Sequence, residues 1–186
     1  MSSKLGSLHY RLDGADRIVE TGSGWDEFAH ANDGAGSGAA DILHRKIYDF
    51  ITDKPVQLIT QSLLEHARKR AVPFSVPFRC DGPSCMREMK MTLAADANGE
   101  VDIQTEVVRK IPRMLARLLD RRARRSNDLI HICAWCKCIL HEGSWIEIDV
   151  AVSKLGYFTE ELLPQLSHGI CPACDAAVSA QMEQLS

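Results

Sequence analysis

Residues 74–107 read FSVPFRCDGPSCMREMKMTLAADANGEVDIQTEV, and apolar side chains alternate with polar ones in three runs of this stretch. A period of two is typical of strands that bury one face. Between the second and third runs, Asp96-Ala97-Asn98-Gly99 has the residues of a tight hairpin turn. The stretch therefore predicts a three-stranded antiparallel meander with the inward positions Phe74, Val76, Phe78, Met89, Met91, Leu93, Val101, Ile103, Thr105 and Val107.

The residues before this meander carry first strand signals and then helix signals. Tyr10–Thr21 has two short apolar runs around a turn, which predicts two strands. Trp25–Ala31 and Ile42–Ile51 have helical spacing, and Pro55 opens a longer predicted helix over Val56–Lys69. We therefore expect an α+β fold, with an antiparallel sheet and flanking helices.

A basic segment follows the meander. Residues 109–125 contain eight Lys or Arg and a single acid, Asp120. Their net charge of +7, set against −3 for the whole chain, leaves −10 on the other residues. Apolar residues at helical spacing predict a basic amphipathic connector helix over residues 111–128. We expect this helix to pack on the sheet or against its copy in a homodimer.

The same segment supports a second interpretation. A nucleic-acid-binding regulator would use clustered arginines as phosphate contacts. The candidates are Arg121, Arg122, Arg124 and Arg125.

Five of the seven cysteines lie in the last third of the chain, and four of them form two Cys-x-x-Cys pairs. Two such pairs can place four thiolates tetrahedrally around one ion. We therefore predict a structural zinc site in a small metal-stabilised module over residues 129–178. An iron–sulfur cluster and a dithiol–disulfide switch remain open alternatives for the same sulfurs. The predicted ligands are Cys133, Cys136, Cys171 and Cys174.

Two residues beside these pairs have predicted roles of their own. His168 lies three residues before Cys171 and is expected either to replace one thiolate or to hydrogen-bond a ligand. Cys138 follows the first pair and is the candidate redox thiol.

Three segments in the first part of the chain belong together. They are YRLDGADRIVETGSGWDEFA (10–29), ILHRKIYDFI (42–51) and VPFRCDGP (76–83), the last followed by Arg87 and the meander. With the order of the predicted elements, they resemble a bacterial group of PAS-type sensory domains. The resemblance extends over about Leu8–Pro112 and puts a PAS-like domain at residues 8–110. The sequence departs from the related pattern at His44, where that pattern usually has glycine.

The tail reads ICAWCK at 132–137 and SHGICPAC at 167–174, with Trp145 between the two segments. It resembles a second recurrent bacterial pattern, one that often follows PAS domains in sensory proteins.

The PAS resemblance implies sensing and not catalysis. Such domains hold a small ligand, haem or flavin between sheet and helices, or simply dimerise. For haem, the candidate axial ligands are His44 and His66, so a haem-based gas or redox sensor is a further alternative. A module of this kind would act on a separate signalling partner.

Composition sets the remaining expectations. The chain has 186 residues, 45% of them hydrophobic and 25% charged, as in ordinary globular proteins. It has no apolar run typical of a secretory signal or a membrane span, and we therefore expect a cytoplasmic protein without membrane contact. No catalytic motif is present, and Asp81 and Glu88 are expected to be solvated. The sequence thus predicts that the protein is not an enzyme.

Overall fold

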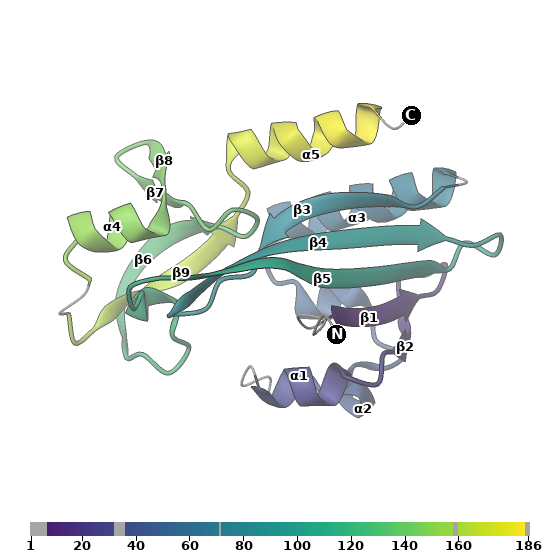
Figure 1. Cartoon of the computed structure of the whole chain (residues 1–186), viewed down its shortest axis with the longest axis horizontal. Coiled ribbons are helices and arrows are strands. Elements are labelled where there is room, and N and C mark those ends of the chain that lie inside the picture. Colours follow the sequence, from purple (N-terminus) through teal and green to yellow (C-terminus); the bar gives the residue numbers. More distant parts are fainter. Residues whose placement is uncertain (1–6, 32–35, 71, 158–159, 185–186) are drawn as a thin grey trace.

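The computed structural model describes residues 7–31, 36–70, 72–157 and 160–184 and contains two sheets. The larger sheet is antiparallel and has the strand order β2-β1-β5-β4-β3, whereas the smaller one has the order β8-β7-β6-β9. Figure 1 shows the smaller sheet at one end of the larger. The expected α+β class, with an antiparallel sheet and helices, is confirmed. Among the described residues, no helix has the length and apolar character needed to cross a membrane.

The larger sheet contains the predicted meander. Phe74 pairs with Leu93, and Leu93 pairs with Ile103, so the predicted inward positions share one face. The turn at 96–99 is also confirmed, because Asp96 N–H donates to the Glu100 carbonyl at 2.9 Å and Gly99 has φ +80°. The strands are β1 (Ser7–Leu12), β2 (Ile18–Thr21), β3 (Phe74–Arg79), β4 (Cys85–Ala95) and β5 (Val101–Pro112).

Helices lie between β2 and β3. They are α1 (Trp25–Ala31), α2 (Ala39–Ile42), the 3-10 helix η1 (Ile47–Phe50) and α3 (Lys54–Lys69). The longer predicted helix is therefore present as α3, and its buried positions Ile59, Leu63, Leu64 and Ala67 form one stripe. Ile42–Ile51 is not continuously helical, because His44 has φ +65° and separates α2 from η1.

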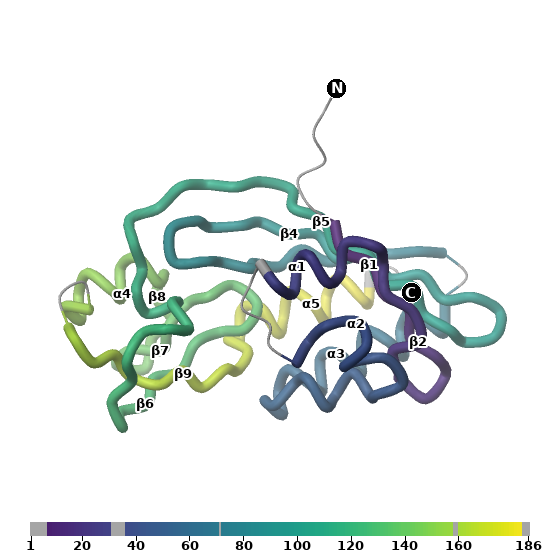
Figure 2. Tube along the Cα trace, turned by 90° about the horizontal axis from the view of Figure 1, so that it is seen from below, coloured from purple at the N-terminus to yellow at the C-terminus, as the bar shows by residue number. Residues whose placement is uncertain are grey.

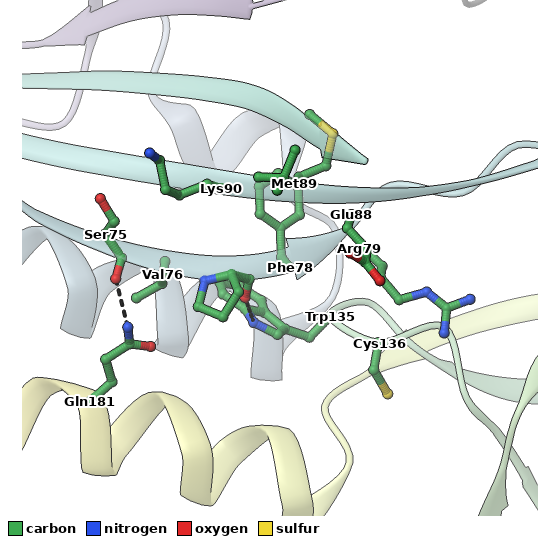
Figure 3. A pocket seen from close by; sticks show the side chains of 12 residues that line it. Ser75, Val76, Phe78, Arg79, Glu88, Met89, Lys90, Trp135, Cys136 and Gln181 are labelled. Carbon is green, nitrogen blue, oxygen red and sulfur yellow. Dashed lines mark hydrogen bonds between the residues drawn. The ribbon is translucent and has the colours of Figure 1, made fainter. Parts of the chain in front are cut away.

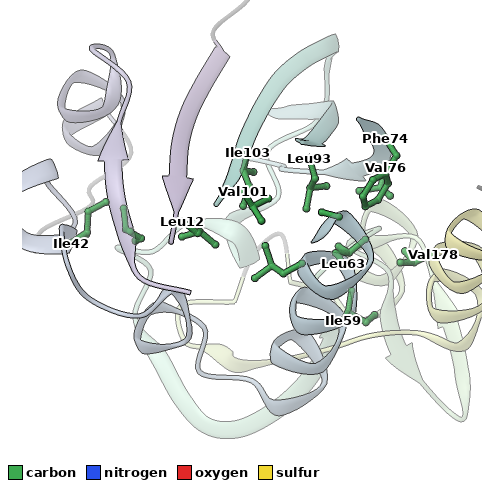
Figure 4. Close-up of a cluster of buried hydrophobic side chains, with 13 residues drawn as sticks. Leu12, Ile42, Ile59, Leu63, Phe74, Val76, Leu93, Val101, Ile103 and Val178 are labelled. Carbon is green, nitrogen blue, oxygen red and sulfur yellow. The ribbon is translucent and has the colours of Figure 1, made fainter. Parts of the chain in front are cut away.

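The stripe of α3 and the inward face of the larger sheet form the main hydrophobic core. Figure 4 shows Leu63 of α3 facing Leu93, Val101 and Ile103 of the sheet. Val178, from the last helix of the chain, belongs to the same core and is 3% exposed. The C-terminal helix therefore packs on the larger sheet domain and not on the smaller sheet.

The smaller sheet has its own core. Its elements are β6 (Arg125–Cys133), β7 (Ile139–His141), β8 (Ser144–Ile146), α4 (Ile148–Lys154) and β9 (Leu163–Gly169), and α5 (Pro172–Gln184) follows. β6 and β9 pair in parallel. The chain enters this part after β5 and returns to the larger sheet between β9 and α5 (Figure 2).

The prediction of a connector helix over residues 111–128 is wrong. β5 continues to Pro112, a short 3-10 helix η2 follows at Arg117–Leu119, and β6 begins at Arg125. Leu118 is fully buried in the core of the smaller sheet, while Leu115 is 56% exposed, so no continuous apolar stripe exists.

Hydrogen bonds from Arg125 stabilise the non-helical conformation of this segment. Arg125 donates to the carbonyls of Leu118 and Asp120 at 3.0 and 2.8 Å, and thereby bonds main-chain groups that a helix would bond internally. The element through which we expected a homodimer to form is therefore absent.

Candidate metal centre

The four predicted ligand cysteines converge. Cys133 ends β6 and Cys136 lies in the turn after it, whereas Cys171 directly precedes α5 and Cys174 lies in its first turn. Although residues 137–170 separate the two pairs, the parallel pairing of Cys133 with Gly169 brings them together. Their Sγ atoms all lie within 4.8 Å of one another. Four cysteines this close could hold a metal ion, as the sequence predicted.

The spacing of the sulfurs suits a tetrahedral thiolate site. Cys136 Sγ lies 3.8 Å from Cys171 Sγ. Zinc–sulfur bonds of about 2.3 Å at tetrahedral angles place two sulfurs about 3.8 Å apart. Cys133 and Cys171 are buried, so the cluster is closed toward the protein interior.

Backbone amides point at the sulfurs. The amides of Cys136 and Cys171 donate to Cys133 Sγ at 3.5 and 3.4 Å, and the amide of Cys174 donates to Cys171 Sγ at 3.4 Å. Each Cys-x-x-Cys pair thus makes the same local N–H···S bond. Such bonds stabilise sulfur in its charged form.

The pKa values of three of the clustered thiols, those of Cys133, Cys136 and Cys174, are shifted. The hydrogen bond with the Cys136 thiol, helped by backbone amides, lowers the pKa of Cys133 to about 4. The same bond raises the pKa of Cys136, and burial raises the pKa of Cys174 to about 12. Four thiolates therefore require a cation between them, and a metal ion that displaces the protons supplies it.

The first pair is docked on the edge of the larger sheet. Trp135, inside the pair, donates from Nε1 to the Pro77 carbonyl at 2.7 Å and accepts from Arg79 N–H at 2.8 Å. Gln181 of α5 donates to the Ser75 carbonyl at 2.7 Å, as Figure 3 shows. Both cysteine-bearing segments thus satisfy main-chain groups of the edge strand β3, which would otherwise be open to other strands.

Asp81 forms a buried ion-pair cluster that joins the two sheets. Its side chain is fully buried and lies 2.5 Å from Arg79 and 2.8 Å from Arg113. Arg79 also pairs with Glu147, and Arg113 with Asp149, both in the part of the chain that holds the smaller sheet. The expectation that Asp81 is solvated is therefore wrong. Arg79, two residues before Asp81 in the sequence, is a local signal for this cluster.

Glu88 is closer to the solvated state that the sequence predicted. It pairs with Arg109 at 2.5 Å, and its side chain is 37% exposed.

His168 lies outside the four-sulfur cluster. Its Nδ1 is 3.7 Å from Asp53 Oδ2, and its side chain is 44% exposed. The structure therefore does not support its predicted role as an alternative ligand.

Cys138 is not one of the four clustered cysteines, although its thiol interacts with that of Cys136. Its Sγ lies 3.8 Å from Glu147 Oε1, and burial together with that carboxylate raises its pKa. A protonated thiol is a poor nucleophile, so this environment does not favour the predicted redox role.

The two candidate haem ligands occupy different settings. His44 is exposed, and its backbone amide and carbonyl bond Ile18 and Arg17. His66 packs edge-on against Phe74, with ring centroids 4.9 Å apart, and its Nε2 lies 3.4 Å from Arg70.

The four candidate phosphate contacts are not equivalent. Arg125 is bonded to carbonyls, and Arg124 pairs with Glu161 at 2.5 Å. Arg121 and Arg122 are exposed.

Comparison of the chain with protein-family models and with curated proteins found no match. The structure shows a mixed α+β protein with a four-cysteine candidate metal site between its two sheets.

Proposed function

We propose that the protein is a non-enzymatic cytoplasmic sensory module, in which a structural zinc ion holds the C-terminal segments on the edge of a PAS-like domain. The observation that carries this proposal is the position of the four-cysteine cluster. The cluster lies where the Trp135 turn and α5 both bond β3. A conformational change in the PAS-like domain would therefore alter the position of the C-terminal segments, and a change in those segments would alter β3.

The donor set favours zinc with a structural role. Four thiolates fill a tetrahedral shell and leave no position for water or substrate, unlike a catalytic zinc site. The small core of the second sheet also gains from a metal, because zinc binding contributes folding free energy directly. An iron–sulfur cluster or a thiol switch at the same sulfurs would be recognised by iron content or by a reversible disulfide.

Two observations support a PAS-like sensory domain. The larger sheet and its helices follow the element order on which the resemblance rests, namely two strands, short helices, a longer helix and three strands. His44, where the related pattern usually has glycine, has φ +65°, a conformation that favours glycine. In this proposal, the module transmits its state to a separate signalling protein.

The alternative functions receive less support. Nucleic-acid binding would rely on an arginine cluster in which Arg124 and Arg125 are already bonded within the chain. Haem ligation would rely on His44, which is exposed, or on His66, which packs against Phe74.

The proposal predicts that metal removal frees the β3 edge. After treatment with a chelator, the Arg79 amide should lose protection from hydrogen exchange, because its acceptor is the Trp135 carbonyl in the metal-bound turn. The amide of Ile103, in the centre of the larger sheet, is the internal control and should stay protected. Hydrogen exchange with metal content measured on the same sample checks this. An Arg79 amide that stays protected after complete metal removal contradicts the proposal.

A further inference from the structure

A cavity of about 490 Å³ lies between α1 and the face of the larger sheet formed by β1, β4 and β5. Leu8, Met89 and Val107 line its sheet side, and Phe28 of α1, 37% exposed, lines the other. The volume falls within the range of about 300–1,000 Å³ that small-molecule sites have. The cavity therefore suits the apolar body of a small ligand.

Two cations line the same cavity. Arg87 and Lys110 are register partners on β4 and β5, so their side chains share one face. The Arg87 Nε donates to the Cys80 carbonyl at 2.6 Å, which orients the guanidinium. Within residues 7–31, 36–70, 72–157 and 160–184, neither cation forms an ion pair. Glu27 of α1 is the one acidic residue of this lining, so the local charge of +1 favours a monoanion.

A second groove on the molecule lacks this feature. It has a volume of about 470 Å³ and lies between Trp135, Gln181 and the opposite face of the sheet (Figure 3). Its charged side chains are paired, Arg79 with Asp81 and Glu147, Lys90 with Glu106, and Glu88 with Arg109. Paired charges do not select an ionic ligand, and the cavity at Arg87 is therefore the better candidate.

We propose that the cavity beside α1 binds a small organic monoanion, a carboxylate on an apolar aryl or alkyl body. The carboxylate lies between Arg87 and Lys110, and the apolar body lies against Phe28 and Met89. A guanidinium fork matches the geometry of a carboxylate. The role of this ligand as a signal rests on the proposed sensory function, whereas its binding does not depend on the metal site.

The test is a calorimetric titration of the full metal-loaded chain with 4-phenylbutyrate. The neutral 4-phenylbutanamide, which has the same apolar body, is titrated in parallel. The acid should bind with one-to-one stoichiometry, and the amide should bind about tenfold more weakly or worse, since hydrogen bonds to charged groups are the stronger ones. The affinity for the acid should also fall as salt is added.

Single substitutions test whether Arg87 and Lys110, and not other cations of the sheet, bind the carboxylate. Arg87→Gln and Lys110→Gln should each weaken binding of the acid by about tenfold. Lys90→Gln makes the matched change on the opposite face and should leave the affinity unchanged. Because Arg87 also bonds the Cys80 carbonyl, the exposed Lys110 carries the test if Arg87→Gln misfolds.

Three results would overturn the inference: no binding of the acid at millimolar concentration, equal affinity for acid and amide, or full affinity in Lys110→Gln. Metal content and Arg79 exchange are measured on the same protein. If the acid does not bind while the metal content and the Arg79 exchange are as predicted, the ligand site is refuted and the proposed function stands. If the acid binds but the natively purified protein contains no metal, the proposed zinc-dependent function is refuted and the ligand site stands.

Discussion

Replacing Cys133 with serine is expected to abolish metal binding and to unfold the segment around the smaller sheet. Cys133 is fully buried, and its sulfur accepts amide bonds from both Cys-x-x-Cys pairs. Structural zinc is worth about 10–16 kcal/mol of apparent binding free energy in small peptides, and much of this is lost with one of four ligands. We expect the thermal midpoint to fall by about 10 °C or more, at 2–4 °C for each kcal/mol in a chain of this size.

Cys138→Ser is the matched control for this change. It removes a sulfur five residues along the chain that lies outside the four-cysteine group. Metal content and circular dichroism of the two variants provide the comparison. Zinc retained in Cys133→Ser, or equal losses in both variants, would refute the assigned ligand set.

Asp81→Asn should give the second large effect, a loss of stability of about 3 kcal/mol. Removing one partner of a buried ion pair typically costs about 3–5 kcal/mol, because the remaining charge is left in a poorly solvated place. Arg79 and Arg113 are 14% and 4% exposed at their side chains, and both lose their common carboxylate. Glu147 and Asp149 still neutralise them in part, which places the effect at the lower end.

Chemical denaturation measures this loss, and Glu161→Gln provides the control. Glu161 pairs with Arg124, but both side chains are largely exposed, and such pairs contribute little. Equal midpoints for Asp81→Asn and Glu161→Gln would show that the buried cluster does not join the two sheets.

The larger sheet could be predicted because its local signals agree with one another. The alternation from Phe74 to Val107, the turn at 96–99 and the stripe of α3 all favour the same elements that the structure contains. The segment over residues 111–128 could not be predicted in this way. Arg, Leu and Met have good helix propensity, but the burial of Leu118 and the bonds of Arg125 to carbonyls depend on contacts with the smaller sheet.

In the candidate site, too, some features could be predicted from local sequence and others depend on tertiary contacts. The two Cys-x-x-Cys pairs identify the four sulfurs from spacing alone, since each pair folds locally onto one position. Their location beside β3 follows from the parallel pairing of β6 and β9 and from the Trp135 bonds, which no short motif encodes. The burial of Asp81 likewise depends on Arg113, a residue 32 positions away.

Metal analysis of the natively purified protein tests the central claim most directly. The account predicts one zinc ion per chain, with Cys133, Cys136, Cys171 and Cys174 protected from alkylation until the metal is removed. A protein without zinc in which all seven cysteines are freely alkylated, or one that contains iron instead, would contradict it.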